Sequence, residues 1–269
     1  MLVPFDPPMT LFPDFEPWQF AAISLIFVWS GFVRSGLGFG GAVLSLPFLL
    51  WVHNDPIYFL PIIAVHLLVF SSLIMWQSQR KRAAAGARSS DTIDWNYLKQ
   101  SLKIMIVPKL IGIAGLVTLP AAVMSSIIFV IVTVYSVGYI LNRPFRSNRA
   151  WLDKVFLALG GYVSGTSLIA APLVMAVYST HVAKEKLRDT LFVLWFVLVT
   201  LKMGSFLALG VDLQLTQHLW LLPCAFVGHV MGERFHARML QTDTVTFFRF
   251  LGSVLLAVSL LGLVRVVIE

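Results

Sequence analysis

The sequence Gly31-Phe-Val-Arg-Ser-Gly-Leu-Gly-Phe-Gly-Gly-Ala-Val-Leu-Ser-Leu-Pro47 joins two apolar segments, residues 19–33 and 37–51. This backbone therefore lies at membrane depth, where it carries an arginine, a serine and a cluster of glycines. Hydrocarbon tolerates a broken helix only where protein or a water-filled cavity satisfies the freed N–H and C=O groups. Helix-breaking glycines beside a cation in a membrane therefore indicate a place where a polar ligand, an anion in particular, is held.

The composition of the whole chain is that of a membrane protein. Hydrophobic residues make up 58% of the sequence and charged residues 12%, and apolar stretches of spanning length recur between residues 20 and 268. The net charge of +7 does not indicate a nucleic-acid partner, because the cations lie mainly in short loops, as cytoplasmic loops of membrane proteins require. We expect an all-α, polytopic, multi-pass membrane protein, with the lipid bilayer as its surroundings.

The loops between the apolar segments predict how the chain crosses the membrane. Basic residues cluster in four loops, around Arg82, Arg146, Lys186 and Arg238, whereas the turns at Asp55 and Asp212 carry no cation. The positive-inside rule places the four basic loops in the cytoplasm and residues 1–17 outside, as an extracytoplasmic tail. The apolar segments are residues 19–33, 37–51, 57–76, 104–119, 123–141, 155–178, 191–209, 217–231 and 245–268.

This topology divides the chain into two halves of the same plan. Residues 19–51 form a broken helical hairpin with Arg34 at its tip, residues 155–178 form a second hairpin that enters from the opposite side, and three spans follow each hairpin. We therefore expect two inverted repeats, residues 18–142 and 143–269, as in many secondary transporters. The alternative is that glycine and proline, on which the likeness of the halves rests, are simply common in membrane helices.

Three stretches of this sequence resemble the TauE/SafE family of sulfite exporters, also called the TSUP family. They are the glycine-rich residues 36–47, the sequence Gly-Tyr-Val-Ser-Gly at 161–165 followed by Pro172, and residues 223–238 before the last apolar segment. The resemblance implies transport, as export across a bacterial inner membrane, of small anions such as sulfite or organosulfonates. The two inverted repeats predict that this transport occurs by alternating access. The lack of a catalytic constellation predicts that the protein is not an enzyme. One departure is that residues 166–171 read Thr-Ser-Leu-Ile-Ala-Ala, where family members often carry a glycine triplet.

The predicted anion site combines both hairpins with a buried cation. Backbone N–H groups of glycines, hydroxyl groups and a guanidinium fork are suitable donors for an oxyanion. The candidate residues are Arg34, Ser35, Gly36, Gly38, Gly40, Gly41, Ser164, Gly165, Thr166, Ser167 and Lys202. His66 is a candidate for proton coupling because a histidine titrates near neutral pH. The sequence predicts no catalytic residue, no cofactor and no metal site.

Each candidate also has a structural interpretation. The glycines could serve close helix packing, Arg34 could anchor the hairpin at the headgroups, and Lys202 could pair with Glu233. Lys109, near a span end, could snorkel to the surface, and His66 could be a hydrogen-bonded core residue. For the whole chain the alternative is a membrane-embedded enzyme or an assembly factor without transport activity. The lack of a metal or nucleophile pattern argues against the enzyme, and a buried cation argues against the scaffold. An oligomer is compatible with the sequence.

Overall fold

The structure, a computed structural model, describes residues 15–37, 41–84, 92–143, 147, 149–239 and 244–268. These residues form α-helices and short 3-10 segments, and no strand occurs among them, so the all-α prediction is confirmed. The helices are α1 (Pro17–Leu37), α2 (Gly41–Val52), α3 (Pro56–Ala84), α4 (Trp95–Thr118), α5 (Ala121–Ile140), α6 (Ala150–Thr166), α7 (Ala171–His181), α8 (Lys184–Ala208), η2 (Leu215–Gln217), α9 (His218–Met239) and α10 (Thr244–Ile268).

Five of the described helices are long and apolar enough to cross a membrane: α3, α4, α5, α8 and α10. The segment at 217–231, which the sequence predicts as a further span, forms the first part of α9, and α9 is not among these five. Many large apolar side chains on the long helices are exposed, for example Val107 on α4 and Val264 on α10. Apolar side chains in this number on a surface are suited to lipid and not to water.

The boundaries of α4 differ most from the sequence prediction. The apolar segment was placed at residues 104–119, whereas the helix begins at Trp95. The carboxylate of Asp94 caps it by accepting a hydrogen bond from the backbone N–H of Tyr97 at 3.0 Å. The first turns of α4 carry Lys99 and Lys103, and hydropathy alone excludes such charged turns from a span although they continue the same helix.

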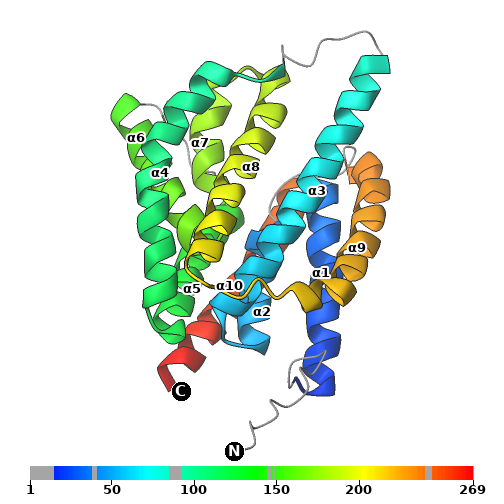
Figure 1. Cartoon of the computed structure of the whole chain (residues 1–269), viewed down its shortest axis with the longest axis vertical. Helices are drawn as coiled ribbons and strands as arrows, with labels where there is room; N and C mark the ends of the chain where they lie inside the picture. The colour runs from blue at the N-terminus through cyan, green and yellow to red at the C-terminus, as the bar shows by residue number, and fades with distance from the viewer. Residues whose placement is uncertain are drawn as a thin grey trace, which may run out of the picture.

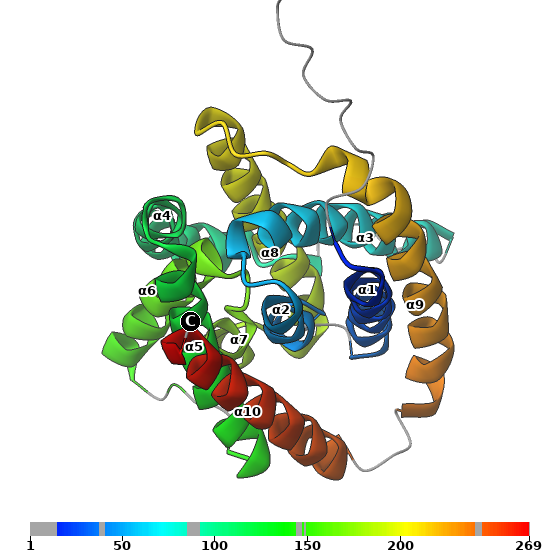
Figure 2. The same ribbon diagram turned by 90° about the horizontal axis from the view of Figure 1, so that it is seen from below.

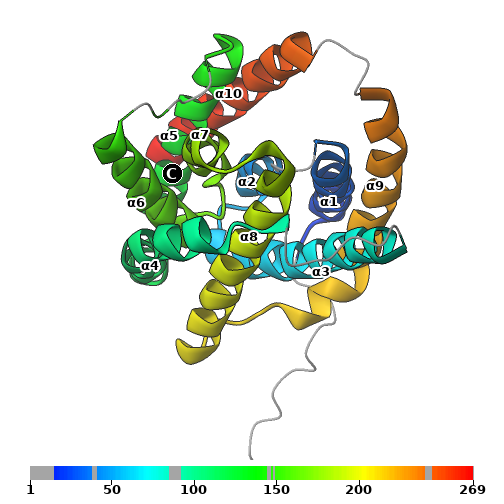
Figure 3. The ribbon, with the colours of Figure 1, turned by 90° about the horizontal axis from the view of Figure 1, so that it is seen from above.

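Both predicted hairpins are present as pairs of helices, α1 with α2 and α6 with α7. The breaks fall after Leu37 and after Thr166, and the second arms α2 and α7 are short. Viewed along the helices, α2 and α7 lie inside a ring made by the other helices (Figures 2 and 3). Nearly every residue of α2 is buried, in agreement with this central position. The two hairpins therefore bring their broken ends into the interior of the protein.

Glycines allow the first arms of the hairpins to pack against neighbouring helices at close range. Gly228 and Gly232 of α9, in a Gly-x-x-x-Gly arrangement, face the backbone of α1, and a Cβ at either position would overlap an α1 carbonyl oxygen. Gly161 and Gly165 of α6 have the same spacing and face the backbone of α4 in the same way. Small residues at this spacing are typical of close helix pairs in membranes.

We expect alanine at Gly228 to destabilise the protein strongly. The added Cβ would overlap the carbonyl oxygen of Val28, and a backbone atom cannot rotate away, so the cost is about 1–3 kcal/mol or more. Gly204 on α8 is the matched control, since a Cβ there meets nothing within 4 Å in the described part of the chain. Thermal unfolding in detergent should show a lowered melting temperature for Gly228→Ala alone, and equal melting temperatures would contradict the close packing.

The helix ends separate into two layers. In Figure 1, α1 begins and α10 ends at the bottom, where α2 also leads into α3 and α8 leads toward α9. The ends of α3 and α9 and the beginnings of α4, α6 and α8 lie at the top. The turns with Asp55 and Asp212 therefore lie at the bottom, and the basic residues Arg80, Lys184 and Arg234 belong to the top. The loop residue Arg146 lies outside the described residues.

We predict that the top layer faces the cytoplasm. Cysteine can be placed at Lys184 or at Asp212 in a Cys224→Ser background, which removes the single native cysteine. A membrane-impermeant thiol reagent added to intact cells should label the cysteine at position 212 and leave the one at position 184 unlabelled until the membrane is opened. The opposite pattern would invert the topology.

Candidate functional site

Two lysine side chains meet the end of α6, at the break of the second hairpin. Lys109 of α4 donates to the backbone carbonyl of Ser164 at 3.2 Å and to its hydroxyl at 2.9 Å. Lys202 of α8 donates to the backbone carbonyl of Gly165 at 2.6 Å. Both lysine side chains are fully buried. Two ammonium groups therefore converge on consecutive carbonyls in the interior of the protein.

The end of a helix explains why the lysines bind there. The last carbonyls of an α-helix have no partner within the helix and carry partial negative charge. In α6 the carbonyl of Val163 accepts from the N–H of Ser167 at 2.9 Å, and the next two carbonyls accept from the lysines. Lys109 thus turns toward α6 and stays buried, so the expectation that it could snorkel to the surface is wrong.

The lysine pair has no negative side chain beside it. Within the part of the chain that the structure describes, no carboxylate forms an ion pair with Lys109 or Lys202. A buried cation costs several kcal/mol unless it is paired, and the partial charges of carbonyls compensate for only part of two full charges. The site at the end of α6 therefore has the electrostatic character of an anion site.

The break of the second hairpin contains residues with hydroxyl groups and contains no glycine. The hydroxyls of Thr166 and Ser167 both donate to the carbonyl of Val163, at 3.2 Å and 3.0 Å. Leu168 follows with a φ of 61°, in the left-handed region that costs a residue with a side chain about 1–2 kcal/mol. The stretch at 166–171 thus keeps a left-handed turn in the place where the resembling family often has glycines.

Arg34 lies in the last turn of α1 and is 6% exposed. Its Nη1 donates to the backbone carbonyl of His66 at 3.2 Å, and its guanidinium lies over the ring of Phe70, 5.2 Å from the centroid. Its Nε has no hydrogen-bond partner in the described structure and faces the start of α2, where a Cβ on Gly41 would lie 3.1 Å away. Arg34 is therefore not a headgroup anchor, and a buried unpaired donor beside a helix start is suited to an oxyanion.

Ser35 and Glu233 lie on either side of His229. The hydroxyl of Ser35 is hydrogen-bonded to Nδ1 of His229 across the interface between α1 and α9. On the other side, Nε2 of His229 lies 3.6 Å from a carboxylate oxygen of Glu233, whose side chain is half exposed. The alternative that Glu233 pairs with Lys202 is wrong, because Lys202 binds the Gly165 carbonyl instead.

His66 of α3 is fully buried among aromatic rings. Its ring centroid lies 5.0 Å from that of Phe27 and 5.4 Å from that of His218. Neither ring nitrogen has a hydrogen-bond partner in the described part of the chain. The interpretation of His66 as a hydrogen-bonded core residue is therefore wrong, and its ring keeps both nitrogens for other partners.

The predicted site residues form two clusters, one at each hairpin. The first cluster contains Arg34, Ser35, Gly41 and His66, and the second contains Ser164, Gly165, Thr166, Ser167 and Lys202. Gly36 is buried in α1 where Gly232 of α9 approaches its backbone. Gly38 and Gly40 lie outside the described residues. Sequence reasoning missed Lys109 and His229 as site residues, although both follow a helix-weakening proline or glycine directly.

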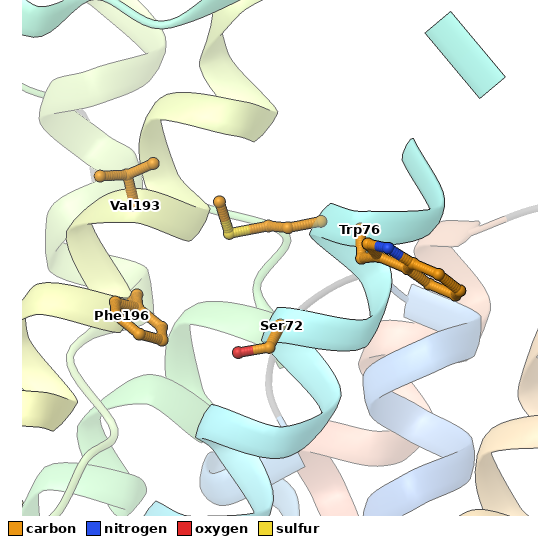
Figure 4. Close-up of a pocket in the computed structure, with 5 residues that line it drawn as sticks. Ser72, Trp76, Val193 and Phe196 are labelled. Carbon is orange, nitrogen blue, oxygen red and sulfur yellow. The ribbon is translucent and has the colours of Figure 1, made fainter. Parts of the chain in front are cut away.

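A pocket of about 280 Å³ lies between α3 and α8 (Figure 4). It is lined by Ser72, Met75, Trp76, Val193 and Phe196, so its walls are mostly apolar, with the Ser72 hydroxyl and the Trp76 indole N–H as the polar side-chain groups. No predicted site residue belongs to this lining, and the pocket has no cation to attract an anion. Among the described residues, no group of three or more His, Cys, Asp or Glu side chains could hold a metal ion.

A comparison with known protein families finds one match. The model of the family described as sulfite exporter TauE/SafE matches residues 23–262, which is nearly the whole chain and includes the breaks of both hairpins. No curated protein and no solved structure matches.

Proposed function

We propose that this chain, which belongs to the sulfite exporter TauE/SafE family, exports small anions such as sulfite or organosulfonates across a bacterial inner membrane by alternating access. The family is one of membrane transporters and not of enzymes, and the apolar helices agree with a multi-pass protein in a lipid bilayer. The pair of buried lysines at the end of α6 is the observation that supports an anion as the substrate. In the described structure no carboxylate lies beside these two lysines.

The substrate would supply the negative charge that these cations lack. Lys109 and Lys202 would attract the oxyanion at the second hairpin, together with the hydroxyl of Ser164. At the first hairpin, the unpaired Nε of Arg34 and the backbone N–H groups at the start of α2 are the corresponding donors. Each cluster lies at a broken helix, where transporters place substrates near the middle of the membrane.

The way the helices pair supports the division into inverted repeats at residues 18–142 and 143–269. The first arm α1 packs against α9 of the other half, and the first arm α6 packs against α4 of the other half. Two further pairs across the halves, α5 with α10 and α3 with α8, each join helices in the same place of their repeat. Exchanging the two halves therefore maps these four pairs onto one another, although α2 also contacts α10.

Individual contacts follow the same exchange. Gly31 of α1 lies against the backbone of Ala225 in α9, and Gly161 of α6 lies in the same way against the backbone of Met105 in α4. Each glycine is the first small residue of the hairpin sequences Gly-Phe-Val-Arg-Ser-Gly and Gly-Tyr-Val-Ser-Gly. The likeness of the hairpins thus extends from their sequences to the partners they contact.

The polar residues correspond as well. Ser35 is hydrogen-bonded to His229 on α9, and Ser164 is hydrogen-bonded to Lys109 on α4. A hydroxyl near the end of each first arm thus meets a basic side chain of the partner helix from the other half. The two clusters support one functional plan in two chemical versions, with a histidine facing the first hairpin and a lysine facing the second.

Flux measurements on purified protein in liposomes test the proposal. Vesicles loaded with labelled sulfite or methanesulfonate should release the label faster than protein-free vesicles do. The same anion added outside without label should accelerate this release by exchange. A membrane-embedded enzyme or an assembly factor gives no such flux. Release no faster than from protein-free vesicles, for every sulfite and sulfonate tested, would contradict the transporter proposal.

A further inference from the structure

Titratable side chains at the first hairpin continue beyond the anion cluster toward both surfaces. On the side of the Asp212 turn, Nε2 of His218 lies 3.3 Å from the carbonyl of Leu213, and the His218 ring lies 5.4 Å from that of His66. Nδ1 of His218 and both nitrogens of His66 have no hydrogen-bond partner in the described structure. Two buried imidazoles, 7% and 0% exposed, therefore lead from this surface into the interior.

A separate chain of groups leads inward from the opposite surface. The half-exposed carboxylate of Glu233 lies 3.6 Å from His229, and His229 is hydrogen-bonded to the hydroxyl of Ser35. His229 is itself 2% exposed. Glu233 follows His229 by one helical turn, on the part of α9 that points to the top layer of Figure 1. This second chain thus ends at the layer that we assign to the cytoplasm.

Phe70 separates the two chains. Its ring centroid lies 6.3 Å from that of His66 and 5.2 Å from that of His229. The guanidinium of Arg34 lies over the same ring, 5.2 Å from its centroid. An apolar ring with a fixed positive charge on its face is a barrier to a proton, because both desolvation and repulsion oppose its passage.

We propose that these groups form a proton pathway in two halves, with His218 and His66 open toward the Asp212 side, His229 open toward Glu233, and Phe70 as the gate between them. A proton arriving from one side leaves an oxygen of water, or of the Glu233 carboxyl, and adds to an imidazole nitrogen, so one O–H bond breaks and one N–H bond forms. After the gate has moved, the reverse transfer to water or to the Glu233 carboxylate on the other side breaks an N–H bond and forms an O–H bond. The pathway rests on the proposed function only in its coupling to the anion.

Arg34 would provide that coupling. In the part of the chain that the structure describes, Arg34 and His218 are the charged or titratable groups that act on His66 from the helices packed around it, and Arg34 and Glu233 are those that act on His229. A free Arg34 repels a proton on His66, whereas an anion bound to Arg34 neutralises this charge. Anion binding and protonation of His66 would therefore favour each other, and by linkage each strengthens the other by the same factor.

Proton conduction by gate variants tests the pathway without any substrate. Liposomes with an internal pH dye and a potassium diffusion potential should acidify at least tenfold faster with Phe70→Ala than with the wild type. Adding His66→Gln to Phe70→Ala should return the rate to that of the wild type, whereas adding His181→Gln, at the other hairpin, should not. Phe70→Leu gives the same comparison if the alanine variant does not fold. The pathway would be overturned if the faster proton conduction of Phe70→Ala persisted after His66→Gln was added. It would also be overturned if the Phe70 variants conducted protons no faster than the wild type.

Anion binding at two pH values tests the coupling. Methanesulfonate keeps its single charge between pH 6 and pH 8, so a change in its affinity reports on the protein. The wild type and His181→Gln should bind it about tenfold more tightly at pH 6, and His66→Gln should bind it equally at both. A wild-type protein that binds anions with no pH dependence would refute the coupling, whereas one that binds none would refute the proposed function and leave the proton conduction result to decide the pathway.

Discussion

Lys202→Met should abolish anion transport while most of the protein still folds. The side chain is fully buried and donates to the Gly165 carbonyl, so methionine keeps its approximate length and loses the charge. A hydrogen bond to a charged group is worth about 1.5–3 kcal/mol, which corresponds to a loss of binding of roughly ten- to over a hundredfold. Flux from liposomes and the rise in melting temperature on addition of sulfite measure the two consequences.

Two comparisons separate a substrate role of Lys202 from a structural one. Lys184→Met removes an exposed lysine at the start of the same helix and should leave both flux and binding intact. If Lys202 served only to cap α6, the folded fraction of Lys202→Met would be smaller but its remaining protein would still be stabilised by sulfite as the wild type is. That outcome would remove Lys202 from the site and leave Lys109 as the cation to be tested.

Most of the fold could be predicted from the sequence, because backbone N–H and C=O groups inside a bilayer must be hydrogen-bonded within the protein and few backbone conformations allow this. Two short, interrupted apolar segments predicted the hairpins that became α1 with α2 and α6 with α7. The charge of the loops predicted which helix ends lie in the same layer. The start of α4 could not be predicted, because Lys99 and Lys103 in its first turns lower the hydropathy on which the boundary rested.

The candidate site could be predicted only in part, for a reason that lies in tertiary contacts. A sequence shows that Lys202 lies inside an apolar segment, but it does not show that a carbonyl at the end of α6 is its partner. The sequence offered Glu233 as a possible partner of Lys202, whereas the structure places the Glu233 carboxylate beside His229. Lys109 looked like an end-of-span residue, and only the packing of α4 against α6 turns it inward.

The position of the unpaired Nε makes Arg34 the second residue whose replacement should have a large effect. Arg34→Lys keeps the charge but removes the planar fork, which presents several N–H groups in fixed directions and which a single ammonium group cannot replace. We expect Arg34→Lys to reduce anion affinity and flux by at least about tenfold, the factor that corresponds to 1.4 kcal/mol. Arg188→Lys, at the start of α8, is the matched control and should behave like the wild type.

Gly41→Ala tests the same donor without changing any charge. A Cβ at this position would lie 3.1 Å from Nε of Arg34 and 3.2 Å from the carbonyl oxygen of Ser30, so it would cover the side of the guanidinium that faces the start of α2. If an anion binds there, Gly41→Ala should weaken binding of sulfite and methanesulfonate alike, and the larger anion more, while Arg34 remains charged. Isothermal titration of detergent-purified protein measures both affinities. Unchanged affinities in Gly41→Ala together with lost binding in Arg34→Lys would mean that the anion approaches Arg34 from the side of Nη2 and not through the break between α1 and α2.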